Sequence, residues 1–165
     1  MGGNEVTILK SQNGWTASAV RGEIHVKNYM VPGTTRHIAC AHGVAPLMVG
    51  FAAEFHKLIE PIDGGKFDDW GYNFALIPGS QTLSNHCSGT AMDINALAHP
   101  WKKRGTFPNA KVPMIRALAK KYGLRWGGDY LHGFVDEMHF EINIKPNEAA
   151  SLIIRLALPE AKEMK

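Results

Sequence analysis

The longest stretch of helical hydrophobic periodicity lies in residues 44–60. Apolar residues recur there three and four positions apart, which places them on one face of an α-helix. Pro46 is compatible with the first turn of this helix, and Pro61 follows its end. Shorter stripes of the same period predict two more helices, over residues 112–122 and 146–158.

Other segments have the period or the residue types of β-strands. Residues 5–10 alternate between apolar and polar side chains and are expected to form an edge strand. Further strands are expected over residues 22–29, 37–41, 70–77, 90–95, 124–126 and 138–144. Because helices and strands are mixed without a regular βαβ repeat, the pattern predicts an α+β fold, with a small, largely antiparallel sheet and packed helices.

The chain of 165 residues suits one compact domain, which we expect to span residues 1–165 with a core over about 15–158. Hydrophobic residues make up 45% of the chain and charged residues 20%, so the core needs no disulfide or metal in order to fold. The longest apolar stretch is too short to cross a bilayer, and the N-terminal residues lack the pattern of a secretory signal. We expect a monomer that does not insert into membranes.

The net charge of +3 and the isoelectric point near 8.9 are compatible with a polyanionic partner such as a cell wall. The sequence has no dense block of Lys and Arg and no nucleic-acid-binding motif, so nucleic acid is not an expected partner. Cys40 and Cys87 are far apart, and neither lies in a CxxC pair. We expect both to be reduced, buried residues rather than a disulfide or a zinc-thiolate site.

Candidate metal ligands fall in two short segments. His86 and Asp93 lie seven positions apart, and His139 follows in a second segment. In the strand expected over residues 90–95, Asp93 would share a face with Asn95. Two imidazoles and one carboxylate leave an open fourth position on a zinc ion, as a hydrolytic site requires. Such a site also needs a nearby carboxylate that accepts the proton of the attacking water.

The two segments together read S-x-H-x-x-x-G-x-A-x-D and D-x-x-H-F-E. This combination resembles the M15 family of peptidoglycan peptidases, which includes D-Ala-D-Ala carboxypeptidases and phage L-alanyl-D-glutamate endopeptidases. The positions that match the family pattern are Ser84, His86, Gly89, Ala91, Asp93, Asp136 and His139. Trp70-Gly71-Tyr72 and Trp126-Gly127-Gly128-Asp129 extend the resemblance to the peptidase domains of phage endolysins.

The resemblance implies a fold of the Hedgehog/DD-peptidase type. It also implies a zinc ion (Zn²⁺) held by His86, Asp93 and His139, with Asp136 as the general base. The expected substrate is the stem peptide of bacterial peptidoglycan, and the expected reaction is the L-Ala–D-Glu cleavage of a phage endolysin that lyses its host. Such a protein stays in the host cytoplasm until lysis and then acts at the cell wall. The alternatives are a D-Ala-D-Ala carboxypeptidase and a non-catalytic zinc module that binds the wall.

Strand periodicity alone favours a different residue, Glu137, as the general base. In an ideal strand Glu137, His139 and Glu141 would share a face, so that Glu137 would point at the metal. The family pattern instead favours Asp136, which requires residues 136 and 137 to lie in a turn. Glu141 is expected either to orient a metal ligand or to be a solvated strand carboxylate.

One position departs from the family pattern. Members usually carry an arginine in the strand before the Ser-x-His motif, and Ala75 stands there in this chain. Stabilisation of the oxyanion contributes several kcal/mol, so the loss has to be explained. Either another donor replaces the arginine, with Gln81, Arg36 and His132 as the candidates, or zinc alone supplies more of the stabilisation, or activity is weak. Further candidate substrate-binding residues are Ser84, which could instead cap a turn, Trp126, which could instead belong to the core, Tyr72 and Tyr130.

Overall fold

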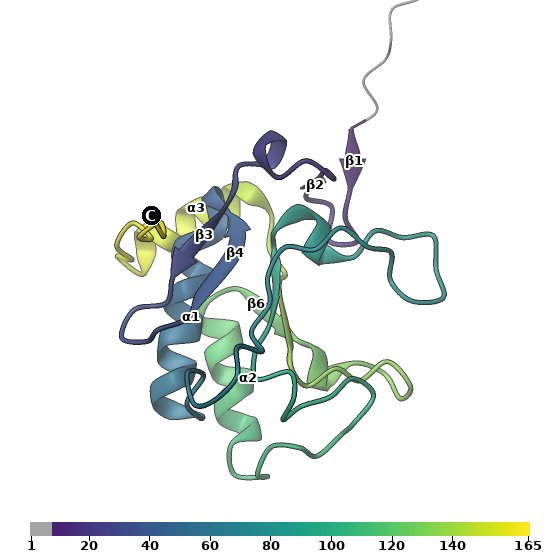
Figure 1. Ribbon diagram of the computed structural model, residues 1–165, viewed down its shortest axis with the longest axis vertical. Coiled ribbons are helices and arrows are strands. Elements are labelled where there is room, and N and C mark those ends of the chain that lie inside the picture. Colours follow the sequence, from purple (N-terminus) through teal and green to yellow (C-terminus); the bar gives the residue numbers. More distant parts are fainter. Residues whose placement is uncertain (1–7) are drawn as a thin grey trace, which may run out of the picture.

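The computed structural model describes residues 8–165, so residues 5–7 of the first expected strand lie outside the described part. Three α-helices lie on one side of the molecule, and long loops project on the other (Figure 1). The strands in chain order are β1 (Leu9–Lys10), β2 (Thr16–Ala17), β3 (Val26–Met30), β4 (His37–Ala41), β5 (Ala91–Asp93), β6 (Leu124–Trp126) and β7 (His139–Ile142).

All three predicted helices are confirmed, as α1 (Ala45–Leu58), α2 (Val112–Lys121) and α3 (Pro146–Arg155). Each begins with a proline in its first turn, where a missing backbone N–H costs nothing. No helix within residues 8–165 has the length and apolar character that a membrane span requires.

The described strands form three small antiparallel sheets, ordered β1-β2, β3-β4 and β5-β7-β6. The predicted α+β class is therefore confirmed. The three-stranded sheet has β7 at its centre, where Asp93 pairs with His139 and Arg125 pairs with Glu141. Successive side chains of a strand point to opposite faces, so each of these pairs shares one face of the sheet.

The other face of this sheet packs on the hydrophobic core. Phe140 of β7 is fully buried and contacts two aromatic rings of α1, with ring centroids 4.6 Å from Phe51 and 5.7 Å from Phe55. Trp126 of β6 is also buried, at 3% exposure. Because the apolar residues of β6 and β7 face the helices, the polar residues between them face the opposite side. The core thus determines which residues can form a site.

Three strand predictions need correction. Residues 70–77 do not form a strand and make only the isolated bridges of Trp70 with Asp93 and of Leu76 with Leu83. Residues 22–29 are divided, because His25 has a left-handed backbone conformation (φ 51°) and separates a 3₁₀ turn, Arg21–Ile24, from β3.

The strand over residues 90–95 is also shorter than predicted. Asn95 has a φ of 49° and lies outside β5, so it does not share a face with Asp93. The prediction for the cysteines is confirmed, because Cys40 and Cys87 are both buried and free.

Candidate metal centre

Two of the candidate ligands come from neighbouring strands. Asp93 ends β5 and His139 begins β7, and the two residues lie directly opposite each other in the sheet. Opposed side chains on one face of a sheet are close enough to interact. The Oδ1 atom of Asp93 lies 3.0 Å from the Nδ1 atom of His139.

The third ligand, His86, lies in a 3₁₀ turn, η3 (Asn85–Ser88), just before β5. The Oγ atom of Ser84 accepts a hydrogen bond from the backbone N–H of His86 at 3.2 Å and so caps this turn. Gly89 ends the turn with a φ of 66°, a conformation that glycine adopts without strain. The chain then enters β5, which carries Asp93 back towards His86.

The three side chains converge on one point. The Nε2 atom of His86 lies 3.1 Å from the Nδ1 atom of His139 and 3.4 Å from the Oδ1 atom of Asp93. Ligands about 2.0–2.1 Å from a tetrahedral zinc ion stand about 3.3 Å apart. The residues therefore fit three corners of a zinc site and leave the fourth corner open.

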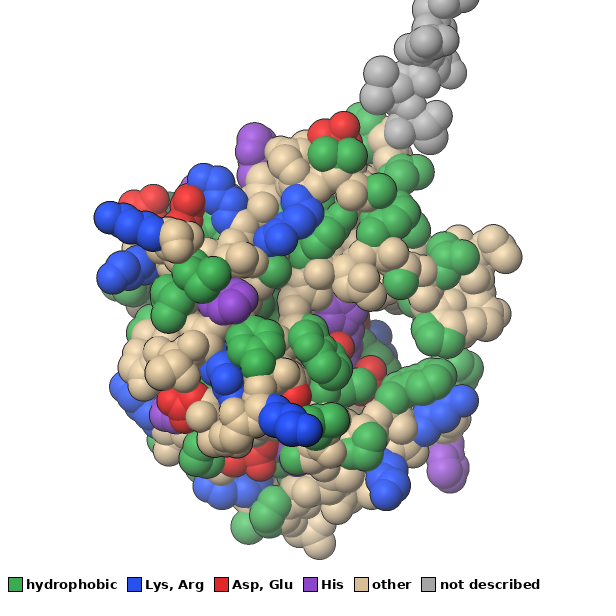
Figure 2. All heavy atoms as spheres, viewed as in Figure 1, with side chains coloured by type: hydrophobic (Ala, Val, Ile, Leu, Met, Phe, Trp, Pro, Cys, Tyr) green, Lys and Arg blue, Asp and Glu red, His purple; other side chains and the backbone are tan. Residues whose placement is uncertain are grey.

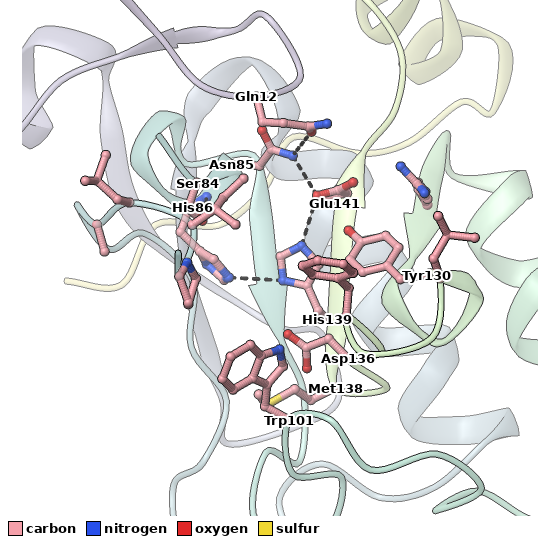
Figure 3. Close-up of a pocket in the computed structure, with 17 residues that line it drawn as sticks. Gln12, Ser84, Asn85, His86, Trp101, Tyr130, Asp136, Met138, His139 and Glu141 are labelled. Carbon is pink, nitrogen blue, oxygen red and sulfur yellow. Dashed lines mark hydrogen bonds and ion pairs between the residues drawn. The ribbon is translucent and has the colours of Figure 1, made fainter. Parts of the chain in front are cut away.

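Hydrogen bonds on the far side of each ring determine which nitrogen faces this point. The Nδ1–H group of His86 donates to the carbonyl oxygen of Gly71 at 2.6 Å. The Nε2–H group of His139 donates to the Oε2 atom of Glu141 at 3.0 Å (Figure 3). The remaining ring nitrogens are thus acceptors, and both face the carboxylate of Asp93. Only a cation satisfies three acceptors at one point.

The pKa values reflect this crowding. Burial disfavours the charged forms, yet the two histidine rings hold the pKa of Asp93 well below its usual range. Burial also opposes the charge on His139, but hydrogen bonds to Asp93 and Glu141 outweigh it and raise the pKa of His139 to about 10. Without a metal, one proton on His139 takes the place of the cation.

Glu141 is the residue that orients His139. Its carboxylate is buried, at 6% exposure, and also accepts a hydrogen bond from the Nδ2 atom of Asn85 at 2.6 Å. The Nδ2 atom of Asn85 in turn donates to Gln12 at 3.0 Å (Figure 3). The expectation that Glu141 is a solvated strand carboxylate is therefore wrong. Sequence reasoning missed both, because Asn85 is the unspecified middle residue of the S-x-H motif and Gln12 lies far from either motif.

Asp136 lies in a turn just before β7, which the backbone bond from His139 N to Asp136 O closes at 3.1 Å. Its side chain lines the same cavity as the two histidines, and its Oδ1 atom is buried without a hydrogen-bond partner among the described residues. Burial raises the pKa of Asp136 to about 6. An unpartnered carboxylate with a raised pKa suits a group that exchanges a proton with substrate.

The rival Glu137 points away from the metal centre. Its carboxylate accepts hydrogen bonds from the backbone N–H groups of Gly105 and Thr106 at 2.7 and 2.8 Å. It is 3% exposed and does not line the cavity. The alternation argument for Glu137 fails because β7 begins only at His139.

The cavity above these residues has a volume of about 590 Å³. Its lining includes four exposed apolar side chains, Leu76, Trp101, Leu131 and Phe134. Figure 2 shows the opening as a gap beside a projecting segment, with histidine and acidic side chains visible at its inner end. The lining therefore favours a ligand that carries apolar groups.

The predicted substrate-binding residues separate into three groups. Ser84 and Tyr130 line the cavity, and Ser84 caps its turn as well. Tyr72 and Trp126 do not line it, because the Tyr72 hydroxyl donates to Ser18 O at 2.8 Å and Trp126 is a core residue whose Nε1–H donates to Glu137 O at 2.8 Å. The predicted substrate contact of Trp126 is therefore wrong, because Trp126 is 3% exposed in the core, whereas that of Tyr72 stays a prediction.

Gln81 and His132 are exposed and lie outside the cavity lining. Their contact with substrate stays a prediction. Ala75, by contrast, lines the cavity at the position where the family pattern has an arginine.

Arg36 is neither a surface residue nor part of the site. It is 7% exposed, and its guanidinium donates to the backbone oxygens of Ile62 at 2.8 Å, Lys66 at 2.8 Å and Gly65 at 3.2 Å. Its Nε atom also lies 3.1 Å from the carboxylate of Asp69. These contacts hold the loop before Trp70 in place, so the proposed reach of Arg36 into the site is wrong.

Arg125 is a lining residue that sequence reasoning missed. It lies between Leu124 and Trp126, which are 5% and 3% exposed. The alternation of apolar and polar side chains in this short strand could have identified it. A residue between two core residues of a strand faces the opposite side of the sheet.

Comparisons with known proteins bear on the same part of the chain. Residues 78–142 match a family model of the M15 peptidases that is described as D-alanyl-D-alanine carboxypeptidase. This range includes the three candidate metal ligands and Asp136. No curated protein and no solved structure matches the chain.

Proposed function

We propose that this chain, which the family match supports as an M15 peptidase acting on peptidoglycan, is a zinc-dependent hydrolase of the stem peptide. The observation that carries the proposal is the convergence of three acceptor atoms, 3.0–3.4 Å apart, beside the unpartnered carboxylate of Asp136. Both features line or adjoin one open cavity.

Some residues of the site would bind zinc, and Asp136 would transfer the proton. His86, Asp93 and His139 would hold the zinc ion, and Gly71 and Glu141 fix the histidine rings in the tautomers that binding requires. When bound, zinc supplies a Lewis acid that polarises the peptide carbonyl and lowers the pKa of water to about 7.

Asp136 accepts the proton of the attacking water and donates it to the leaving amine. Its carboxylate lines the cavity with an Oδ1 atom that has no partner among the described residues, so this oxygen is available for both steps. The peptide bond is cleaved with addition of one water molecule, and Asp136 ends in its starting state.

The bond we assign is the L-Ala–D-Glu bond, cut by a monomeric phage endolysin that leaves the host cytoplasm at lysis and acts on the wall. The exposed apolar side chains of the cavity lining support an endopeptidase, because a peptide that continues past the cleaved bond has further residues to place against them. A D-Ala-D-Ala carboxypeptidase is the second candidate, and the description of the matching family model favours it.

Digestion of purified muropeptides with mass analysis of the products tests the proposal. Cleavage at L-Ala–D-Glu yields a peptide with a new D-Glu amino terminus, whereas a carboxypeptidase releases a single D-Ala. Asp136→Asn is expected to lower the rate by about 10²–10⁴-fold. The matched control is Asp129→Asn, an exposed carboxylate paired with Arg116 outside the cavity.

Thorough chelation is expected to abolish hydrolysis, and added zinc to restore it. Stoichiometric zinc binding without hydrolysis of any muropeptide would contradict the proposal and favour a non-catalytic wall-binding module.

A further inference from the structure

Arg125 lies on the same face of the sheet as the metal ligands. It pairs in register with Glu141, whose carboxylate accepts a hydrogen bond from His139 at 3.0 Å. Its neighbours Leu124 and Trp126 point into the core. Arg125 on β6 is therefore the direct neighbour of Glu141 on β7, the residue that orients the metal ligand His139. Both residues line the same cavity.

The charge of Arg125 is not neutralised by a partner within residues 8–165. The described residues make no hydrogen bond or ion pair with its guanidinium, although Glu141 is the adjacent residue on β7. The carboxylate of Glu141 is engaged by hydrogen bonds from His139 and Asn85. Arg125 thus keeps its donors available on the side of the cavity.

The ring of Tyr130 supports the guanidinium. The Cζ atom of Arg125 lies 4.5 Å from the centroid of this ring, which is within the range of a cation–π contact. Burial and the nearby carboxylate of Glu141 raise the pKa of Tyr130, so its hydroxyl stays neutral beside the guanidinium. Arg125 is the one Lys or Arg residue among the described cavity-lining residues, where the carboxylates of Asp136 and Glu141 supply negative charge.

We propose that Arg125 binds a free carboxylate of the substrate beside the cleaved bond, and so sets the specificity of the site. The planar guanidinium matches a carboxylate in a two-bond geometry that no amide reproduces. In a γ-linked glutamyl residue the α-carboxylate is free and lies next to the scissile L-Ala–D-Glu bond. This inference rests on the proposed function and names the anionic group that the site recognises.

The test uses two synthetic stem peptides that differ only in this group, one with the free α-carboxylate and one with its amide. The zinc-loaded parent is expected to cleave the carboxylate peptide about 10- to 100-fold more efficiently, mainly through KM. Arg125→Gln should reduce this preference to less than about threefold, and Arg125→Lys should retain part of it. A parent without preference, or an Arg125→Gln variant that keeps it, overturns the inference.

A matched control and a binding measurement separate this inference from the proposed function. Arg155→Gln removes the same charge from the exposed end of α3 and should leave the preference unchanged. Zinc content and melting temperature should be equal in the parent and both Gln variants, which a merely structural role of Arg125 would not allow.

Calorimetry decides the inference even if no peptide is cleaved. Zinc-loaded Asp136→Asn protein should bind the carboxylate peptide about tenfold more tightly than the same protein that also carries Arg125→Gln, and the amide peptide equally. Equal affinities of the two proteins for the carboxylate peptide overturn the role of Arg125. Failure of the parent to cleave either peptide refutes the proposed function alone.

Discussion

The Asp136→Asn substitution separates the stability of this protein from its activity. Asp136 is a carboxylate whose Oδ1 atom is buried without a partner, and burial raises its pKa to about 6 from the ordinary value of 3.8. A raised carboxyl pKa means that the folded state binds the proton more tightly than the unfolded state does. Ionisation of Asp136 therefore destabilises the metal-free fold, and an amide at this position removes that cost.

The size and pH dependence follow from the shift. A difference of about two pKa units corresponds to about 3 kcal/mol at 1.36 kcal/mol per unit. Solvent screening at the cavity mouth reduces this figure to about 1–2 kcal/mol. The cost in folding free energy depends on pH in one direction only. It is absent below pH 3.8, grows between pH 3.8 and about 6, and is constant above pH 6.

Urea unfolding of the metal-free parent and of Asp136→Asn, from pH 4.5 to pH 7.5, measures the effect. The variant should be the more stable protein at pH 7.5, by about 1–2 kcal/mol, and the difference should shrink towards pH 4.5. The control Asp129→Asn should show no such trend, because Asp129 is exposed and paired with Arg116. A variant that is less stable than the parent at pH 7.5 would refute the reasoning about Asp136.

Three further substitutions test the buried contacts of Arg36 and the two contacts that orient the histidine ligands. Arg36→Met should lower the free energy of unfolding by about 3–5 kcal/mol in urea titrations, because it strips buried backbone oxygens and a carboxylate of their cation, and a loss under 1 kcal/mol would contradict this. Gly71→Ala should reduce both melting temperature and zinc affinity, because the new Cβ atom would overlap β4 and displace the carbonyl that orients His86; unchanged values of both would argue against it. Glu141→Gln should weaken zinc binding at pH 7 about 10- to 100-fold in a chelator competition, because His139 loses its charged partner, whereas a change below twofold would exclude this role.

The sequence predicted best what depends on local periodicity. The apolar stripe of residues 44–60 identified α1, and the stripe of 146–158 identified α3, because a helix buries one face wherever it packs. The arrangement of His86, Asp93 and His139 followed from two short motifs. The structure brings these three residues within 3.4 Å of one another because β5 pairs with β7 in a register that sets Asp93 opposite His139.

Predictions from local sequence patterns failed where contacts with backbone far away in the sequence determine the structure. The strand-like residues 70–77 make only isolated bridges at Trp70 and Leu76, and Gly71 packs against the backbone of β4 at Ala39, which lies about thirty residues away. Arg36 is buried by carbonyls of residues 62–66, which no spacing near Arg36 could show. The partners of Glu137 lie about thirty residues away, at Gly105 and Thr106.

Anomalous diffraction at the zinc absorption edge, from crystals of the zinc-loaded protein, tests the central claim most directly. We predict one strong peak, about 2.0–2.2 Å from the Nε2 atom of His86, the Nδ1 atom of His139 and a carboxylate oxygen of Asp93. The fourth position should face the cavity beside Asp136. A zinc ion at other residues, or no ion at these three in protein that still hydrolyses the stem peptide, would contradict the account.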